Sequence, residues 1–186
     1  MTTERFPAIP PEQMTPEQRR VAEGIVSGPR GGMRGPFNAW LRSPDVADRF
    51  QRVGEYVRFK TVIPFRLNEL AILVTAREWD SQFEWYAHRR LALQAGLPEA
   101  IADAIAEGRR PEGMNEDETI VYDFATELHR TKEVSDATFD RAKARFGEQG
   151  VIDLVAVCGY YTAVAMTLNL SRVPLPEGAV PLKRLD

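Results

Sequence analysis

The stretch that decides the fold runs from residue 66 to residue 96 and reads RLNELAILVTAREWDSQFEWYAHRRLALQAG. Residues 67–76 leave almost no polar face, and a helix that is apolar all round is buried all round. The residues Trp79-Asp80-Ser81 interrupt this pattern. A second helix is then predicted from about residue 83 to residue 95, with Gly96 as its stop. We therefore expect a buried antiparallel helix hairpin.

Helical periodicity continues on both sides of this hairpin. Residues typical of helix starts occur at Thr15-Pro16, Ser43-Pro44, Pro98-Glu99, Asn115-x-x-Glu118 and Ser135. We expect one apolar stripe to face the core, formed by Val46, Phe50, Val53 and Val57. The most apolar stretch, residues 150–170, is predicted to be a second buried helix, and the helix before it ends at Gly147. No strand pattern of alternating apolar and polar residues persists, so the predicted fold class is all-α.

The length of the chain, 186 residues, predicts one domain over residues 1–186. The core motif region is residues 35–110. Prolines in residues 1–14 predict an arm on the surface or on a neighbouring subunit. Three further prolines in residues 171–186 predict an extended arm that leaves the body.

Composition excludes several classes of function. The formal net charge of −3 gives no electrostatic reason to expect nucleic acid. We expect no membrane span, which needs about 18 apolar residues, and the polar N-terminus lacks the apolar core of a signal peptide. The predicted location is therefore the cytoplasm. The single cysteine, Cys158, excludes an internal disulfide, and the two distant histidines show no metal-binding spacing.

Residues 28–44, GPRGGMRGPFNAWLRSP, form a glycine-rich segment that lacks the Gly-Lys-Ser/Thr ending of a phosphate-binding loop. One interpretation is a flexible connector. The other is a lid whose arginines, Arg30 and Arg34, attract an anionic ligand while other side chains line a pocket. Those pocket-lining candidates are Phe37, Asn38 and Trp40.

The residues that could carry chemistry lie in the hairpin. Glu84 and His88 are four residues apart and therefore share one face of the second predicted helix. Glu69 belongs to the first helix, and an antiparallel hairpin could bring it across from His88. A carboxylate and an imidazole in an apolar pocket form a proton-transfer pair, because burial and mutual hydrogen bonding tune both groups.

Structural interpretations of the same residues stay open at this point. Ser81-x-x-Glu84 is also a capping box, so Glu84 could serve only to satisfy backbone donors. Glu69 is favoured near a helix start by the helix dipole. His129 lies at the basic end of a predicted helix, which indicates a structural or solvent-exposed residue rather than a catalytic one.

The hairpin resembles the carboxymuconolactone decarboxylase family. The resemblance covers most of the chain and lies in these motifs: Arg66-Leu67-x-Glu69-Leu70-x-Ile72-Leu73-x-x-Ala76, Glu84-Trp85-x-x-His88, Ala92-x-x-x-Gly96, Gly35-Pro36-Phe37, Ser43-Pro44 and the ending Asn-Leu-Ser-Arg-Val-Pro. That superfamily has two chemistries. One is a cofactor-free decarboxylase of aromatic catabolism, and the other is an alkylhydroperoxidase D type with a Cys-x-x-Cys-x-x-x-His motif and an upstream glutamate.

Alignment with the peroxidase motif places its histidine on His88 and its glutamate on Glu69, while its two cysteines fall on Ser81 and Glu84. Neither of these side chains can form the disulfide that reduces a peroxide, and Cys158 has no partner. We therefore expect no thiol peroxidase activity. This departure favours the decarboxylase-like branch.

The resemblance implies a cofactor-free carboxy-lyase, without metal, acting on a small carboxylated or lactone-type metabolite. It makes His88 a general acid or base, Glu69 its orienting or relaying partner and Glu84 a group that tunes it. The expected substrate-binding residues are Arg66, Trp85, Phe37, Trp40 and Arg34, with Arg30 as a further cation. It also implies an alkylhydroperoxidase D-like helical fold that assembles as a homotrimer or homohexamer.

Two alternatives remain from the sequence. One is a peroxidase-related protein that lacks the redox cysteine pair. The other is a non-catalytic small-molecule-binding protein on the same helical scaffold.

Overall fold

The structure is a computed structural model that describes residues 3–29 and 31–185. The described residues form helices and no strand, which confirms the predicted all-α class. In chain order the elements are η1 (Pro11–Gln13), α1 (Pro16–Ser27), α2 (Phe37–Trp40), α3 (Pro44–Phe59), α4 (Phe65–Glu78), α5 (Gln82–Gln94), α6 (Glu99–Ala106), α7 (Glu116–Arg130) and α8 (Asp136–Ser171).

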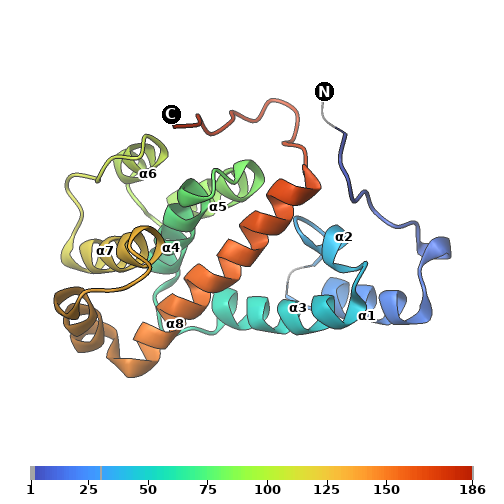
Figure 1. Ribbon diagram of the computed structural model, residues 1–186, viewed down its shortest axis with the longest axis horizontal. Coiled ribbons are helices and arrows are strands. Elements are labelled where there is room, and N and C mark those ends of the chain that lie inside the picture. The colour runs from blue at the N-terminus through green and yellow to red at the C-terminus, as the bar shows by residue number, and fades with distance from the viewer. Residues whose placement is uncertain (1–2, 30, 186) are drawn as a thin grey trace.

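Helix α4 is the centre of the molecule. Every side chain from Leu67 to Arg77 is buried, and the helix packs against α5, α6, α7 and α8 (Figure 1). The all-apolar pattern therefore predicted its burial correctly. A short turn at residues 79–81 reverses the chain, and α5 packs back against α4. The predicted buried hairpin is confirmed.

Helix α8 consists of two helical parts joined at Gly147. This residue has φ 70° and ψ 176°, which lie outside the helical region, so the expected helix end is confirmed. The second part runs diagonally between α3 and α5 (Figure 1). Helix α8 as a whole, Asp136–Ser171, contains an 18-residue stretch with a mean hydropathy of 1.7, so by length and composition it could cross a membrane, although no such span was expected from the sequence. More than half of this 18-residue stretch, 56%, is buried within the protein.

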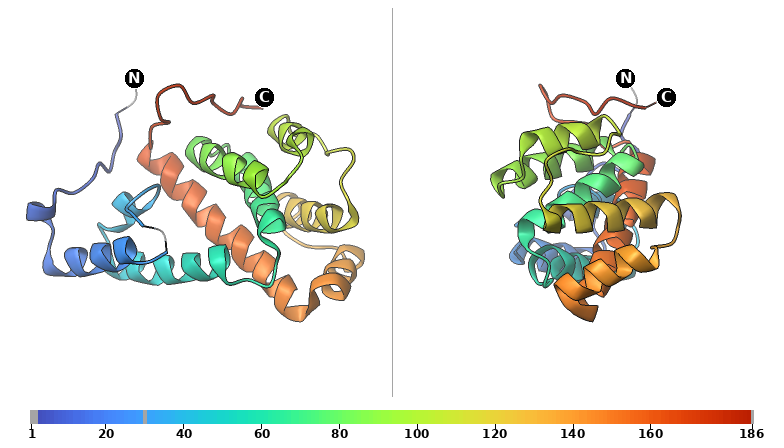
Figure 2. Two further views of the ribbon diagram at one scale, coloured as in Figure 1. Left: turned by 180° about the vertical axis from the view of Figure 1, so that it is seen from behind. Right: turned by 90° about the vertical axis from the view of Figure 1, so that its left-hand side faces the viewer.

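Helices α1 to α3 lie on one side of α8, opposite α6 and α7 (Figures 1 and 2). The predicted stripe on α3 is partly wrong, because Val46 and Val53 are 40% and 48% exposed. The buried face is instead formed by Ala47, Gly54 and Val57. Ala47 and Gly54 are small residues, which suit a helix face packed against its neighbours. The apolar pattern instead selected the larger side chains of Val46 and Val53.

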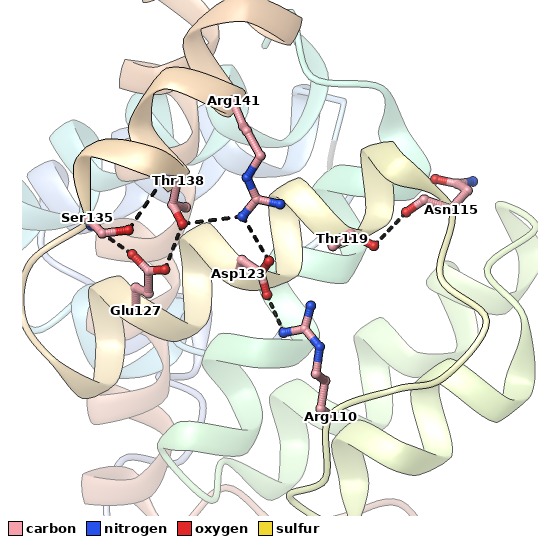
Figure 3. Close-up of polar contacts among 8 residues, drawn as sticks. All are labelled: Arg110, Asn115, Thr119, Asp123, Glu127, Ser135, Thr138 and Arg141. Atoms are coloured by element: carbon pink, nitrogen blue, oxygen red, sulfur yellow. Dashed lines mark hydrogen bonds and ion pairs between the residues drawn. The ribbon is translucent and has the colours of Figure 1, made fainter.

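The turn from α7 into α8 is fixed by polar contacts (Figure 3). One carboxylate oxygen of Glu127 accepts a hydrogen bond from the backbone nitrogen of Ser135 at 2.8 Å, and the other accepts from the Thr138 hydroxyl at 2.7 Å. Asp123 binds Arg141 at 2.9 Å and also pairs with Arg110. These contacts hold the start of α8 against α7.

Both terminal arms contact the helical body through residues near Arg5 and Leu182. In the N-terminal arm, the backbone nitrogen of Arg5 donates to the carbonyl of Ser171 at 2.8 Å. The C-terminal arm does not leave the body as expected. The side chain of Gln82 donates to the carbonyl of Leu182 and accepts from its nitrogen, both at 2.9 Å, and Leu182 is buried. The arm therefore lies along α5 (Figure 2).

Candidate active site

The structure brings His88 and Glu69 into direct contact. The Nδ1 atom of His88, on α5, lies 2.7 Å from Oε2 of Glu69, on α4. Glu69 is fully buried, and His88 is 7% exposed. The hairpin therefore joins an imidazole and a carboxylate that are 19 residues apart in the sequence.

This contact determines which ring nitrogen is available. A carboxylate that accepts from Nδ1–H leaves Nε2 as the nitrogen that can take or give a proton. The ring of Tyr161, on α8, packs edge-on against the imidazole with 4.8 Å between ring centroids. Two neighbouring helices thus fix the orientation of His88.

His88 borders a cavity of about 410 Å³. The cavity lies between the loop before α2, the end of α3, α5 and the second part of α8. Its wall includes Phe37, Tyr160 and Tyr161 beside His88 and Glu84. The volume suits a small metabolite, and the aromatic wall suits a partly apolar one.

Three arginines border the same cavity. Arg34 comes from the glycine-rich segment, Arg58 from α3 and Arg90 from α5. Within residues 3–29 and 31–185, none of the three forms a salt bridge of 4 Å or less with a carboxylate. The Nε atom of Arg58 is also buried without a described hydrogen-bond partner. This arrangement favours an anionic ligand, because arginine pairs readily with carboxylates.

Glu84 lies in the first turn of α5 and is 1% exposed. The capping box that the sequence allowed as an alternative role for Glu84 is not formed, because the Ser81 side chain makes no capping hydrogen bond. Among the described residues neither carboxyl oxygen of Glu84 has a hydrogen-bond partner, so the side chain does not tune His88 by a direct bond. Burial raises the pKa of Glu84 well above its ordinary value, because desolvation penalises the charged form.

Of the five expected substrate-binding residues, Phe37 and Arg34 line the cavity. Arg66 does not reach it, since its guanidinium pairs with Glu118. Trp85 borders a different hollow on the other side of α5. Trp40 is buried behind the wall, where its ring packs against Phe37 and its Nε1 donates to Thr167 at 2.9 Å.

The remaining residues of the sequence analysis lie elsewhere. Asn38 does not line the cavity, and Arg30 lies outside the described residues. Sequence reasoning missed Arg58 and Arg90, because no motif marks them and only packing between distant elements brings them together.

His129 and Cys158 lie outside the cavity lining. The Nε2 atom of His129 lies 2.9 Å from the Thr75 hydroxyl, and burial lowers the pKa of His129. This placement supports a structural role. Burial also raises the pKa of Cys158 to about 12, so its thiol stays protonated and unreactive at neutral pH. The described residues contain no cluster of three or more His, Cys, Asp or Glu suited to a metal ion.

The fold and this site define an all-helical protein with a buried histidine–carboxylate pair that opens on a small cavity. No family model and no curated protein matches the sequence. A solved structure, the alkylhydroperoxidase AhpD core of an uncharacterized peroxidase-related protein from Ralstonia eutropha JMP134, is similar with a TM-score of 0.75. The match covers 95% of this chain and 94% of that one at 15% identity. The chain therefore has the alkylhydroperoxidase D-like fold that the sequence motifs predict.

Proposed function

We propose that this protein is a cofactor-free acid–base enzyme of the carboxymuconolactone decarboxylase-like kind, acting on a small carboxylated or lactone-type metabolite. The observation that supports the proposal is the buried His88–Glu69 pair, 2.7 Å apart, at a cavity bordered by Arg34, Arg58 and Arg90. The arginines hold a carboxylate, and the imidazole exchanges protons with the reacting carbon.

In this mechanism the substrate loses carbon dioxide from a carbon next to a carbonyl group. The carbon–carboxylate bond breaks and its electron pair moves to the carbonyl oxygen, which gives an enolate. Protonated His88 then delivers its Nε2 proton to the carbon, which restores the carbonyl. Glu69 stabilises the imidazolium form and holds the ring in place. Water then returns a proton to His88, so the reaction consumes one solvent proton and needs no oxidant or reductant.

The proposal extends to location and assembly. We propose a cytoplasmic protein that works in aromatic catabolism and forms a homotrimer or homohexamer. An exposed apolar row on α8 supports self-association, because Ile152, Met166 and Leu170 are each about half exposed or more. Light scattering coupled to size-exclusion chromatography tests the assembly, and a monomer at micromolar concentration would contradict it.

Two assays test the chemistry. The first is a scan of carboxylated lactones and 3-oxo acids for release of carbon dioxide. The second follows deuterium exchange next to the carbonyl of 4-oxopentanoate by NMR, which needs no knowledge of the natural substrate. We expect His88→Ala to abolish both activities. His129→Asn is the matched control, because His129 is the only other histidine of the chain and does not line the cavity.

A peroxidase-related function is the second candidate, because the similar solved structure carries that description. Peroxide consumption with and without a dithiol separates the two. The positions of Ser81 and Glu84 and the pKa of Cys158 lead us to expect no thiol-dependent turnover. Inactivity in every assay, together with ligand binding that His88→Ala leaves unchanged, would favour a non-catalytic binding protein.

A further inference from the structure

Glu84 is a buried polar residue in the first turn of α5. It lies four residues before His88, so both side chains project from one face of α5, and both border the cavity. Neither of its oxygens has a hydrogen-bond partner among residues 3–29 and 31–185. An unpaired buried polar group costs about 1–3 kcal/mol, so its presence requires an explanation.

The ordinary structural explanations do not fit Glu84. It does not cap α5, because the contacts of a capping box are missing. It forms no salt bridge with a described cation, and the Nδ1 atom of His88 is already held by Glu69. Desolvation raises the pKa of Glu84, which favours the protonated carboxylic acid. A protonated carboxyl group is a hydrogen-bond donor as well as an acceptor.

We propose that Glu84 is a second catalytic residue, a neutral acid that protonates the carbonyl oxygen of the substrate while His88 acts on the adjacent carbon. This inference rests on the proposed function. As the carbon–carboxylate bond breaks, its electron pair moves to the carbonyl oxygen, which takes the proton of Glu84 to give an enol. His88 then protonates the carbon, and the enol proton returns to the Glu84 carboxylate. Water then returns a proton to His88, so one solvent proton replaces the lost carbon dioxide and no oxidant or reductant is needed.

The placement of the charged groups defines the class of substrate. The three arginines supply positive charge at the cavity, whereas Glu84 supplies a proton donor for the carbonyl oxygen and His88 exchanges a proton with the adjacent carbon. The matching ligand carries a carboxylate at one end and an enolisable carbonyl group at the other. Both carboxyl oxygens of Glu84 are buried, so the proposed contact with the carbonyl oxygen requires a rotation of the Glu84 side chain toward the cavity.

Binding of 4-nitrophenolate, whose oxygen resembles that of an enolate, tests the donor role directly. Absorbance titration gives its affinity for the wild type and for two variants. Glu84→Ala removes the donor, and we expect affinity to fall about tenfold or more. Glu84→Gln keeps an N–H donor but has no acidic proton, so we expect affinity within about threefold of wild type and loss of deuterium exchange. The exposed Glu148→Gln is the matched control.

Infrared spectroscopy gives a second readout that needs no ligand. At pH 7 we expect the wild type to show the carbonyl stretch of a protonated carboxylic acid, absent in Glu84→Gln and retained in Glu148→Gln. Thermal midpoints of all variants show whether each one folds.

The outcomes separate this inference from the proposed function. If His88→Ala abolishes exchange but Glu84→Ala binds the probe as tightly as wild type, the proposed function stands and the role of Glu84 falls. An absent infrared band in the wild type would also overturn that role. If His88→Ala leaves exchange unchanged, the proposed function falls, and this inference with it.

Discussion

Replacement of Glu69 by glutamine isolates the contribution of its negative charge. The side chain is fully buried and its Oε2 atom lies 2.7 Å from Nδ1 of His88. Glutamine has nearly the same shape and can still accept a hydrogen bond from Nδ1–H. The variant therefore removes the charge and keeps the geometry of the pair.

The magnitude follows from the electrostatics of the imidazolium form. Two unit charges about 4 Å apart interact by about 4 kcal/mol at an effective dielectric constant of about 20. The neutral hydrogen bond of glutamine recovers about 1 kcal/mol or slightly more. The remaining loss of about 2–3 kcal/mol corresponds to a fall of about 30- to 150-fold in the rate of proton exchange.

Deuterium exchange into 4-oxopentanoate measures this effect, and urea unfolding measures stability beside it. We expect stability to change by less than about 1 kcal/mol, because the loss of the buried charge offsets the weaker hydrogen bond. Glu69→Ala should also lose stability, by about 2–4 kcal/mol, since it leaves a void and an unpaired ring nitrogen. An unchanged exchange rate in Glu69→Gln would refute the role of the carboxylate.

Three further predictions concern stability. Leu182→Ala should cost about 2–4 kcal/mol in urea unfolding, because Leu182 is 6% exposed and its backbone is held by Gln82; an unaltered midpoint would show that the arm is not docked. Gly108→Ala should lower the thermal midpoint at a cost of about 1–2 kcal/mol, since φ is +70° and a Cβ atom would lie 2.4 Å from a Leu185 methyl group; equal midpoints would count against this conformation. Glu84 should make the free energy of unfolding fall with rising pH, because its pKa in the folded protein lies above its ordinary value of 4.5. The stability that the protonated Glu84 contributes is complete below pH 4.5 and is lost as the pH rises through the folded pKa. Unfolding of the wild type and Glu84→Gln across pH 4 to 8 measures the difference, at up to about 1.4 kcal/mol per pH unit, and parallel curves would contradict it.

The parts of the fold that the sequence predicted are those that local chemistry determines. The capping boxes at Thr15 and Asn115 are both formed, and Gly147 breaks the helix as expected. The all-apolar run predicted the burial of α4, and the hairpin then placed Glu69 beside His88. Each of these outcomes depends on residues close in sequence or on one short turn.

The parts that could not be predicted depend on packing between distant elements. Arg58 reaches the cavity only because the end of α3 lies against α8 and α4. Arg66, one turn before the buried glutamate, lies beside Glu118 of α7 instead of the cavity. The C-terminal arm docks through Gln82, a residue with no sequence signal for such a contact.

The positions around α5 show how one helix divides two hollows. Successive residues of a helix are about 100° apart, so Glu84 and Trp85 point in different directions although they are adjacent. Glu84 and His88 border the cavity of about 410 Å³, whereas Trp85 borders the hollow of about 750 Å³ beside α6 and the C-terminal arm. Helix geometry alone therefore argues against Trp85 as a partner of His88 in substrate binding.

The outer edge of α5 borders both hollows. Tyr86 and Arg90 are four residues apart, are exposed and line each of them. Arg90 is therefore the cavity arginine whose replacement should disturb binding without disturbing the core. We expect Arg90→Gln to weaken 4-nitrophenolate binding several-fold at low salt, with a thermal midpoint within about 1 °C of wild type, because surface substitutions change stability little. Equal affinity in low and high salt for both proteins would show that the cations at this edge do not attract the ligand.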